Sequence, residues 1–411
     1  MGCESNSRNA TPPERGIAPG GELIDAMAAA RSVRIDPRIP ALVAGFDAPF
    51  FQAGLAGYSD AAMRLVARRQ GCPYCVTEAL LDRTLLCGGR GFAKADLGDL
   101  AENVPGGAED APLAGQIMGS DPDEMAAGAV MMVEQGKRGA RSYRRMRDEH
   151  QTTAGGVRAE LDEDGFGFAA IDVNLACPVK KISKKARGGH WLSEPEGAIE
   201  ILRAVRGALP RDVVTTVKMR RGSDDSAEAE RNFMRIFDAA YEMGYAWVTV
   251  HGRTVEQKYV GPSRWTFLRE LVRMRADRLI FGSGDVWSAE EIFRMIAYTG
   301  VHAVSVARGC IGDPWVFRRA RQMMAGVEPT EPTLAEQRRV LIEHFELSVA
   351  LNGERLAGRL MRKFGIKFSQ HHPRAGEVKE RLCRVSTTGE WLDAIDAFYP
   401  CEAGAGVRTG A

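Results

Sequence analysis

Apolar runs of strand length alternate with segments of helical periodicity along most of this 411-residue chain, and no other feature restricts its fold as strongly. Parallel strands need a crossover connection, usually a helix, so the alternation is typical of α/β proteins. Eight candidate strands lie at Phe50–Leu55, Tyr74–Glu78, Leu113–Met118, Ala169–Asn174, Val213–Met219, Trp247–His251, Leu279–Ser283 and Ala303–Ala307. Helical patterns lie between them at Asp60–Gln70, Pro122–Gln135, Pro195–Ala208, Ala227–Met243, Arg264–Arg275, Ala289–Ala297 and Pro314–Ala325. Eight units over about 280 residues predict a TIM (β/α)8 barrel.

A doubly wound open sheet is the alternative fold, because the number of strands is hard to derive from a sequence. The dinucleotide-binding version of that sheet carries a G-x-G-x-x-G pattern after its first strand. This chain has no such pattern after Phe50–Leu55, which favours the barrel.

The domain prediction places the barrel at residues 41–330 and a smaller, all-helical domain at 333–400. Residues 137–165 interrupt the alternation between a helix and the following strand, so this insertion is expected on the face opposite the active site. Residues 1–40, which are rich in Gly, Pro, Ser and Arg, are predicted to be a poorly ordered leader, and 401–411 are predicted to be a disordered tail.

The helical domain carries a concentration of positive charge. From residue 355 to residue 384 there are nine lysines and arginines against two glutamates. Leu356, Leu360 and Phe364 are expected on one face of a helix, and Arg355, Arg359 and Arg362 on another, to judge from their helical spacing. Because the whole chain has a net charge of only +1, such a cluster predicts local phosphate binding rather than general attraction to nucleic acid.

Cysteine usage and hydropathy place the chain in a reducing compartment. Eight cysteines without a signal-peptide pattern indicate free thiols in the cytoplasm, and no apolar run reaches the length of a membrane span. Cys72-Pro-Tyr-Cys75 has the spacing of half a metal site. No second pair accompanies it, and residues three apart on a strand face opposite ways, so we expect no metal. From the hydropathy we expect no membrane contact.

The fourth candidate strand ends in an unusual way, at Asn174-Leu175-Ala176-Cys177-Pro178. Pro178 forces an extended backbone on Cys177, which places the thiol just beyond the strand, where a parallel barrel performs its chemistry. A cysteine in such a place is more often a small buried side chain than a catalyst. Four lysines then follow, Lys180, Lys181, Lys184 and Lys185, and they favour a site for an anionic polymer.

Polar side chains also end several other strands. Lys218 and Arg220 lie two residues apart and so face the same side of their strand, while Gln116 and His251 end two more strands. The last two strands finish in Gly282-Ser283-Gly284-Asp285 and Ala307-Arg308-Gly309, and these loops are the usual phosphate site of a TIM barrel. Together these positions predict a phosphorylated cofactor such as FMN across the barrel mouth.

From about Pro49 to Tyr399 the chain resembles the tRNA-dihydrouridine synthase family. The family's Asn-x-x-Cys-Pro is Asn174–Pro178 with the paired lysines after it, and its Val-Lys-x-Arg is Val217–Arg220. Its long His-Gly-Arg-Thr motif is matched throughout His251–Pro262 and is the most diagnostic of the matches. Gly312–Trp315 and Met361–Lys363 match two further motifs.

The resemblance implies a role for each matched position. The residues expected to bind FMN are Gly54, Leu55, Ala56, Gln116, Lys218, His251, Ser283, Gly284, Asp285, Ala307 and Arg308. Those expected to bind the target uracil are Asn174, Arg220 and Tyr259. The chain departs from the family at Gly54-Leu55, at Ser283 in place of asparagine and at Ala307 in place of glycine. Ser283 is the departure expected to weaken a flavin hydrogen bond.

The resemblance also implies the reaction, which is the reduction of uridine in tRNA to 5,6-dihydrouridine. Reduced FMN would give a hydride to C6, NADPH would recharge the flavin, and Lys218 would stabilise negative charge on it. An ordinary thiol has a pKa near ~8.5, so Cys177 is expected as the acid that protonates C5. We expect a cytoplasmic, monomeric enzyme with tRNA as its partner.

Two other functions stay open at this point. A flavin barrel that reduces a free pyrimidine, as dihydroorotate-type oxidoreductases do, would have the same phosphate loops but no need of the basic helices. A non-catalytic RNA-binding relative would have lost the flavin, and the presence of Cys177, Lys218 and His251 counts against it.

Overall fold

The structure is a computed structural model that describes residues 24–87, 108–134, 167–178 and 188–400. Several sequence predictions concern residues outside these ranges. They are the first part of the leader, the insertion 137–165, the four lysines Lys180, Lys181, Lys184 and Lys185, and the tail 401–411.

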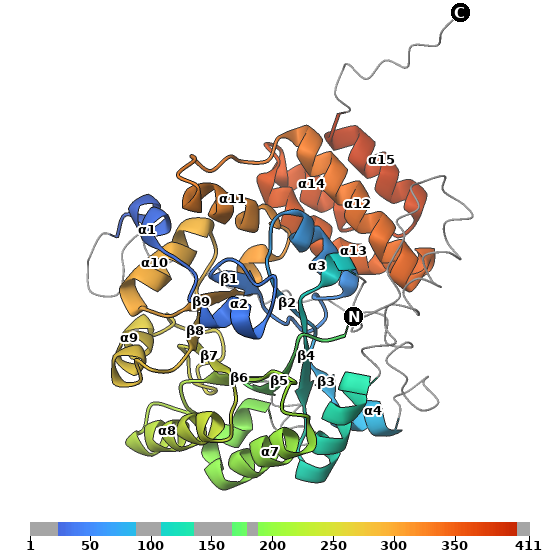
Figure 1. Ribbon diagram of the computed structural model, residues 1–411. Helices are drawn as coiled ribbons and strands as arrows, with labels where there is room; N and C mark the ends of the chain where they lie inside the picture. The colour runs from blue at the N-terminus through green and yellow to red at the C-terminus, as the bar shows by residue number, and fades with distance from the viewer. Residues whose placement is uncertain (1–23, 88–107, 135–166, 179–187, 401–411) are drawn as a thin grey trace, which may run out of the picture.

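Eight parallel strands close into a barrel (Figure 1). They are β1 (Phe50–Gln52), β2 (Cys75–Val76), β4 (Leu113–Met118), β5 (Ala170–Leu175), β6 (Thr215–Arg220), β7 (Trp247–His251), β8 (Ile280–Ser283) and β9 (Ala303–Val306). The first strand β1 pairs with the last strand β9, and β2 pairs with both β1 and β4, so no edge is left open. The predicted TIM barrel is therefore confirmed and the open sheet is excluded. A short extra strand, β3 (Leu80–Leu81), lies beside the end of β4 and was not predicted.

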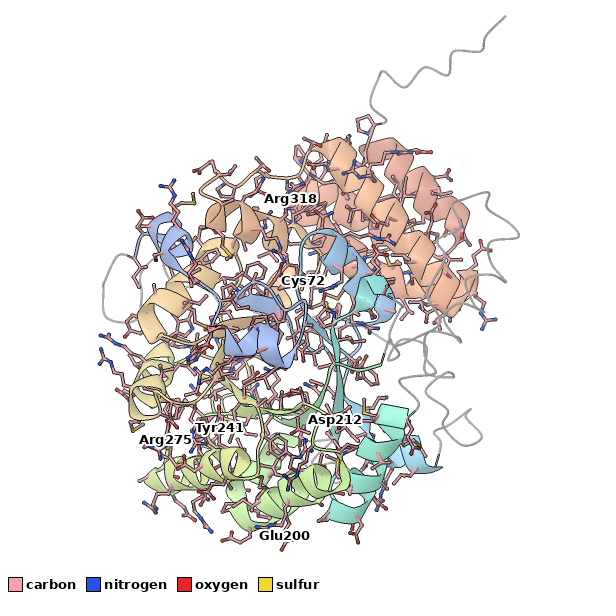
Figure 2. The ribbon with its side chains drawn as sticks, in the orientation of Figure 1. Cys72, Glu200, Asp212, Tyr241, Arg275 and Arg318 are labelled. Atoms are coloured by element: carbon pink, nitrogen blue, oxygen red, sulfur yellow. The ribbon has the colours of Figure 1, made fainter. Side chains whose placement is uncertain are left out.

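The predicted helices surround the barrel (Figure 1). They are α3 (Ala61–Arg69), the helix at 122–134, α7 (Pro195–Ala208), α8 (Ala227–Glu242), α9 (Trp265–Met274), α10 (Ala289–Thr299) and α11 (Trp315–Met324), with one unpredicted short helix, α4 (Asp82–Cys87). Helix α8 illustrates why they form, since its buried Phe233, Ile236, Phe237 and Ala240 recur at helical spacing. Polar side chains such as Glu200 on α7 lie on the outer side (Figure 2).

The second half of the predicted leader is ordered, which corrects the prediction for residues 24–40. Helix α1 (Ala26–Ser32) begins at Asp25, whose carboxylate caps it, and buries Ala26 and Ala30. Helix α2 (Arg38–Leu42) buries Ile39 in a cluster with Phe46 and Trp247 at the N-terminal end of the barrel. Composition alone suggested disorder here. A few apolar residues are enough to order the segment, because they pack against the apolar N-terminal end of the barrel.

Four helices follow the barrel and pack beside α3 and α11 (Figure 1). They are α12 (Leu334–Asn352), α13 (Glu354–Phe368), α14 (Ala375–Leu382) and α15 (Thr388–Phe398). Gly312 shows how closely α13 approaches the barrel, since a Cβ at this glycine would lie 2.4 Å from the Cβ of Lys367. On the barrel side, the Lys363 ammonium donates to the carbonyl oxygen of Gly57.

The predicted apolar face of α13 is partly wrong. Leu356 is 47% exposed, whereas Ala357, Met361, Phe364 and Phe368 are buried. Leu356 directly precedes Ala357 in the helix, so its side chain lies at the edge of the buried face and not within it. Among the described residues, no helix is both long enough and apolar enough to span a membrane.

Candidate functional site

All fifteen candidate site residues line one cavity at the C-terminal ends of the strands. The empty space of this cavity, including the part open to solvent, is about 1070 Å³. Its lining includes Gly54, Leu55, Ala56, Gln116, Asn174, Cys177, Lys218, Arg220, His251, Tyr259, Ser283, Gly284, Asp285, Ala307 and Arg308. They come from seven strand ends that are far apart in the sequence, so the closed barrel is what brings them together.

A buried carboxylate, Asp172, organises the floor of the cavity. It accepts hydrogen bonds from Thr216 Oγ1 at 2.6 Å and from Gln116 Nε2 at 2.7 Å. Gln116 Oε1 in turn accepts from Asn174 Nδ2 at 2.7 Å. Burial raises the pKa of Asp172, while the hydrogen bonds from Thr216 and Gln116 act in the opposite direction. Asp172 thus orients the Gln116 amide, and the Gln116 amide in turn orients that of Asn174.

Asn174 also orients the loop that carries Cys177. Its Oδ1 accepts from the backbone N–H groups of Ala176 at 2.9 Å and Cys177 at 3.2 Å. The chain returns to this point at Gly189, whose N–H donates to the Cys177 carbonyl at 2.9 Å. Gly188 has φ +46° and lies so close that a Cβ there would be 2.9 Å from the Cys177 Cβ. The backbone of Cys177 is therefore fixed from both sides, with the residue on the cavity wall.

Lys218 points a desolvated ammonium group into the cavity. Among the described residues its one hydrogen-bond acceptor is Ser283 Oγ, at 3.4 Å. Burial lowers the pKa of Lys218 to about 8, with Asp172 raising it and Arg220 lowering it to smaller extents. A buried cation with so weak a partner is costly, and a negatively charged ligand would compensate it.

His251 is neutral in this environment. Burial lowers its pKa well below the ordinary range, and the charges of Arg220 and Lys218 lower it further. The backbone N–H of Arg253 donates to His251 Nδ1 at 3.1 Å, so the proton of the neutral ring is on Nε2. His251 therefore offers a hydrogen-bond donor to the cavity without a charge.

Side chains of the long motif at His251–Pro262 mostly form hydrogen bonds within their own loop and with the neighbouring loops. Arg253 Nη2 donates to both carboxylate oxygens of Asp285 at 2.7 Å, and Asp285 also accepts from the N–H of Ser263 at 2.6 Å. Gln257 Oε1 accepts from Arg221 and from the N–H of Thr254, both at 2.9 Å. The Asp285 side chain is thus engaged with protein groups, which leaves its backbone as its part of any cofactor contact.

Arg220 braces the loops around the cavity. Its Nε donates to the carbonyl of Ala176 at 2.9 Å, and its Nη1 to the carbonyls of Thr254 and Lys258, both at 2.8 Å. The guanidinium carbon lies 5.6 Å from the ring centroid of Tyr259. Nη2 has no hydrogen-bond acceptor among the described residues and is the edge available to a ligand.

Sequence reasoning missed three residues of this site. Asp172 and Thr216 form the floor network, and Trp287 lines the rim. Asp172 had a visible signal, because a carboxylate two residues before Asn174 in an apolar strand points to the same interior. Trp287 had none, since a tryptophan after a strand end is usually part of the core.

The donor set fits FMN. The cavity offers the Lys218 ammonium, the neutral His251 and the partly exposed guanidinium of Arg308, which suits an anionic ligand with hydrogen-bond acceptors. Two glycines of the cavity lining allow close packing of neighbouring loops. A Cβ at Gly54 would lie 2.4 Å from the Thr77 carbonyl oxygen, and one at Gly284 would lie 2.3 Å from Ser263 Oγ. Glycine is required at both positions for the loops to pack this closely.

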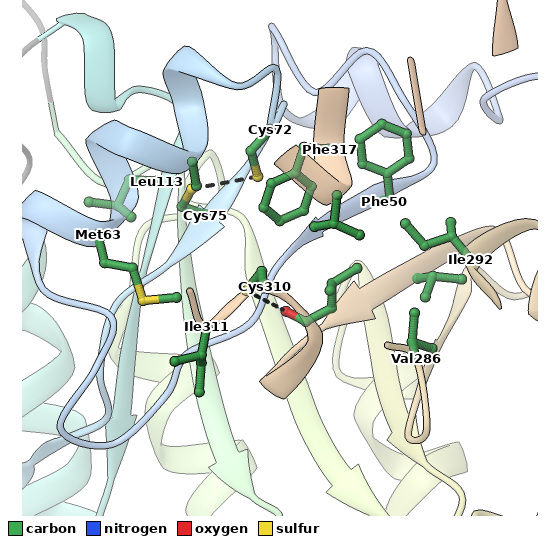
Figure 3. Packing of buried hydrophobic residues seen from close by; sticks show 14 of the residues in the cluster. Phe50, Met63, Cys72, Cys75, Leu113, Val286, Ile292, Cys310, Ile311 and Phe317 are labelled. Carbon is green, nitrogen blue, oxygen red and sulfur yellow. Dashed lines mark hydrogen bonds between the residues drawn. The ribbon is translucent and has the colours of Figure 1, made fainter. Parts of the chain in front are cut away.

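The cysteine pair differs from its predicted geometry. Cys72 Sγ and Cys75 Sγ lie 3.8 Å apart, so the two thiols face each other (Figure 3). The prediction that they point opposite ways was wrong because Cys72 precedes the strand, which begins at Cys75. Both are buried beside Phe50 and Phe317. Within the described ranges, no group of three or more His, Cys, Asp or Glu residues is arranged to hold a metal ion.

The basic helix α13 presents two of its three arginines to solvent. Arg355 and Arg359 are exposed. Arg362 instead donates to the Val385 carbonyl and the Ser386 hydroxyl, which holds the start of α15 against α13. Only the first two are therefore placed to meet a ligand.

Similarity to known proteins gives evidence that is independent of the site geometry. The profile of the family described as Dihydrouridine synthase (Dus) matches residues 156–400, which is more than half of the chain. The tRNA-dihydrouridine synthase B of Shewanella oneidensis is 29% identical over 349 residues, which cover 84% of this chain and 94% of that protein. That of Pseudomonas aeruginosa is 28% identical over 349 residues, covering 84% and 91%. Among solved structures, histamine dehydrogenase from Rhizobium sp. 4-9 aligns with a TM-score of 0.46 at 11% identity over 79% of this chain and 51% of that chain. A likeness this distant carries no argument about function.

Proposed function

The chain belongs to the dihydrouridine synthase family, and on that premise we propose that it reduces uridine to 5,6-dihydrouridine in tRNA, with FMN as cofactor and NADPH as reductant. The single observation that supports this most strongly is the cavity itself. Cys177 stands on its wall together with Lys218, His251 and Asn174, which are the residue types that this reaction needs.

The cofactor would be held by donors from several strand ends. Bound there in its reduced form, FMN would supply a hydride to C6 of the uracil, and NADPH would regenerate it. Lys218 places a positive charge where the flavin ring is expected, and His251 Nε2–H adds a neutral donor. The loops after β8 and β9, with Arg308, are the proposed phosphate site.

The proton for C5 is assigned to Cys177. Its backbone is fixed by hydrogen bonds with Asn174 and Gly189. Little conformational entropy is therefore lost when the thiol is positioned for the reaction. Asn174, Arg220 through Nη2, and Tyr259 would orient the uracil ring. Because Arg220 also donates to the carbonyl of Ala176, one side chain links the substrate pocket to the segment that carries the thiol.

The tRNA is proposed to be gripped outside the cavity by phosphate contacts that include Arg355 and Arg359. Their replacement by glutamine should lower the slope of log Kd for tRNA against log salt by roughly one unit for each lost contact. Arg362→Gln is the matched comparison, because that side chain is engaged with Val385 and Ser386 and its loss should lower stability instead. An unaltered slope in the double variant would remove α13 from the RNA contact surface.

The direct test is chemical. Full-length protein loaded with FMN should form dihydrouridine in an unmodified tRNA transcript when NADPH is added, with dihydrouridine measured by mass spectrometry of the nucleosides. Free uracil and orotate, supplied in place of tRNA, should not be reduced. Protein that takes up no FMN, or that reduces the free pyrimidine and leaves tRNA unmodified, would overturn the proposal.

A further inference from the structure

One tryptophan stands apart from all the others in the molecule. The chain has six tryptophans, and all six lie within the described residues. Five are at most 7% exposed, whereas Trp287 is 44% exposed. An exposed indole leaves a large apolar surface in water, and such surfaces commonly mark a contact site.

Trp287 lies on the rim of the cavity and is held in place. Its indole ring is 4.5 Å from the guanidinium carbon of Arg308, which is also 5.0 Å from the ring of Tyr259. The backbone is fixed as well, since Glu291 accepts from the N–H of Ser288 in a capping box at the start of α10. On the other side, a Cβ at Gly309 would lie 2.9 Å from the Trp287 Cα.

A purely structural role does not account for this position. A hydrophobic residue just before an N-cap often packs against the fourth residue of the helix, which is Ile292 here. That packing buries the first residue, yet Trp287 keeps almost half of its surface in solvent while Ile292 is fully buried. The exposed part of the ring is therefore available for contact with another molecule.

Tyr259 lines the same cavity as Trp287, and the residues on either side of it in the chain are exposed as well. Tyr259 is 55% exposed and Val260 is 77% exposed, and Lys258 beside them is exposed with φ +50°. Tyr259, Trp287 and Arg308 lie together on the rim, with the guanidinium next to both rings, and we call these three residues the rim cluster. Aromatic and guanidinium planes beside a positive charge are the features by which proteins bind unpaired nucleotides.

We propose that Trp287 stacks on the nucleobase that neighbours the target uridine in the tRNA strand. This inference rests on the proposed function. A uridine that enters the cavity draws its covalent neighbours over the rim, and contacts with flanking nucleotides are a known means of substrate selection in enzymes that act on extruded bases. Arg308 supports the indole from one side, and the exposed surface of the ring receives the base.

The first experiment measures tRNA affinity in FMN-loaded, full-length protein. Stacking on one base predicts that Trp287→Ala raises the Kd for unmodified tRNA roughly 5- to 150-fold. Trp287→Phe, which keeps a stacking ring, should stay within a few-fold of the wild type. Met274→Ala is the matched control, because Met274 is 53% exposed at the far end of α9 and should leave the Kd unchanged.

The second experiment observes the ring in the wild-type protein. Acrylamide should quench one accessible class of tryptophan, and that class should vanish in Trp287→Phe. Saturating tRNA should protect it, as should a short single-stranded RNA at higher concentration. This measurement decides the matter even if Trp287→Ala fails to fold.

Three results would overturn the proposal. They are a wild-type tRNA affinity in Trp287→Ala, an indole that stays accessible in the tRNA complex, and a variant that loses only FMN affinity or only the rate of flavin reduction by NADPH. The last would mean that Trp287 orients Arg308 or contacts the nicotinamide. Each is distinguishable from failure of the proposed function, which would appear as a wild-type protein that forms no dihydrouridine.

Discussion

The two ends of the barrel interior are built from the same strands and have opposite characters. At the N-terminal end the rings of Phe46 and Tyr74 stack at 4.6 Å, and those of Trp247 and Phe281 at 4.9 Å. At the C-terminal end the same strand β7 presents His251, four residues after Trp247. Successive inward positions of a barrel strand occupy successive layers, so one strand serves packing at one end and chemistry at the other.

The layer between the two ends is polar, and its carboxylate is hydrogen-bonded. Asp172 and Thr216 hydrogen-bond to each other beneath the cavity and above the aromatic layer. Changes at the aromatic end should alter stability and leave the chemistry of the folded molecules intact, whereas changes at the cavity end should alter the chemistry.

The largest effect is expected at the cavity end, from Cys177→Ala. Oxidation of the reduced flavin by tRNA should slow by the ~10²–10⁴ that is typical of losing a positioned acid. FMN binding and reduction by NADPH should stay near wild type, because neither step uses the thiol. Rapid-mixing absorbance with unmodified tRNA measures the step. Cys383→Ala, which removes an exposed thiol, is the control, and a wild-type rate in Cys177→Ala would assign the proton to another residue.

The opposite end should respond to Trp247→Ala. Removing this fully buried ring is expected to lower the free energy of unfolding by about 3–5 kcal/mol. The turnover of the molecules that remain folded should stay within a few-fold of wild type. Urea unfolding followed by circular dichroism measures the loss. Trp287→Ala provides the contrast, since an exposed tryptophan should change stability by less than about 1 kcal/mol. If Trp247→Ala inactivated a fully folded protein, the two ends would not be separable.

Lys218→Met tests whether the cavity end is destabilised for the sake of function. Burial lowers the Lys218 pKa from 10.5 to about 8, so the unfolded chain binds this proton more tightly than the folded one. The cost to stability is therefore present below pH 8 and disappears as the pH rises toward 10.5. Without FMN, the variant should be more stable than wild type at pH 7, by up to about 3 kcal/mol.

This stability difference should shrink at pH 9.5, and denaturant titrations at the two pH values measure it. Lys379→Met, on the exposed side of α14, should show no pH-dependent difference. A variant that is less stable than wild type at neutral pH would mean that the ammonium group contributes to folding. The FMN affinity of Lys218→Met should fall in either case.

The smallest effect is expected from Ser283→Asn, which restores the residue usual in the family. The longer amide can reach a flavin acceptor more closely than the hydroxyl, and one added hydrogen bond predicts a roughly two- to tenfold lower Kd for FMN. Ser283 is only 1% exposed, so the alternative is overpacking. A fluorescence titration with FMN distinguishes the two, because overpacking would raise the Kd and lower the free energy of unfolding together.

The sequence by itself determined the order of strands and helices in the barrel, and it indicated which strand-end residues would meet at one cavity. Strand-then-helix periodicity predicted the closed barrel, and the ends of predicted strands contained Gln116, Asn174, Lys218 and His251, all of which line the cavity. These predictions were possible because both signals are local: alternation reports burial, and a residue just past a parallel strand must lie at the same end of the sheet as the others.

Only the tertiary structure decided the features that depend on residues distant in the chain. It placed Ile39 of the supposed leader under the barrel and turned Cys72 toward Cys75. It also left Trp287 exposed against Arg308, although a sequence gives no reason to expect a tryptophan there in solvent. Whether a side chain is buried depends on which other segment packs against it. That packing partner is often far away in the sequence, so no local sequence pattern can reveal it.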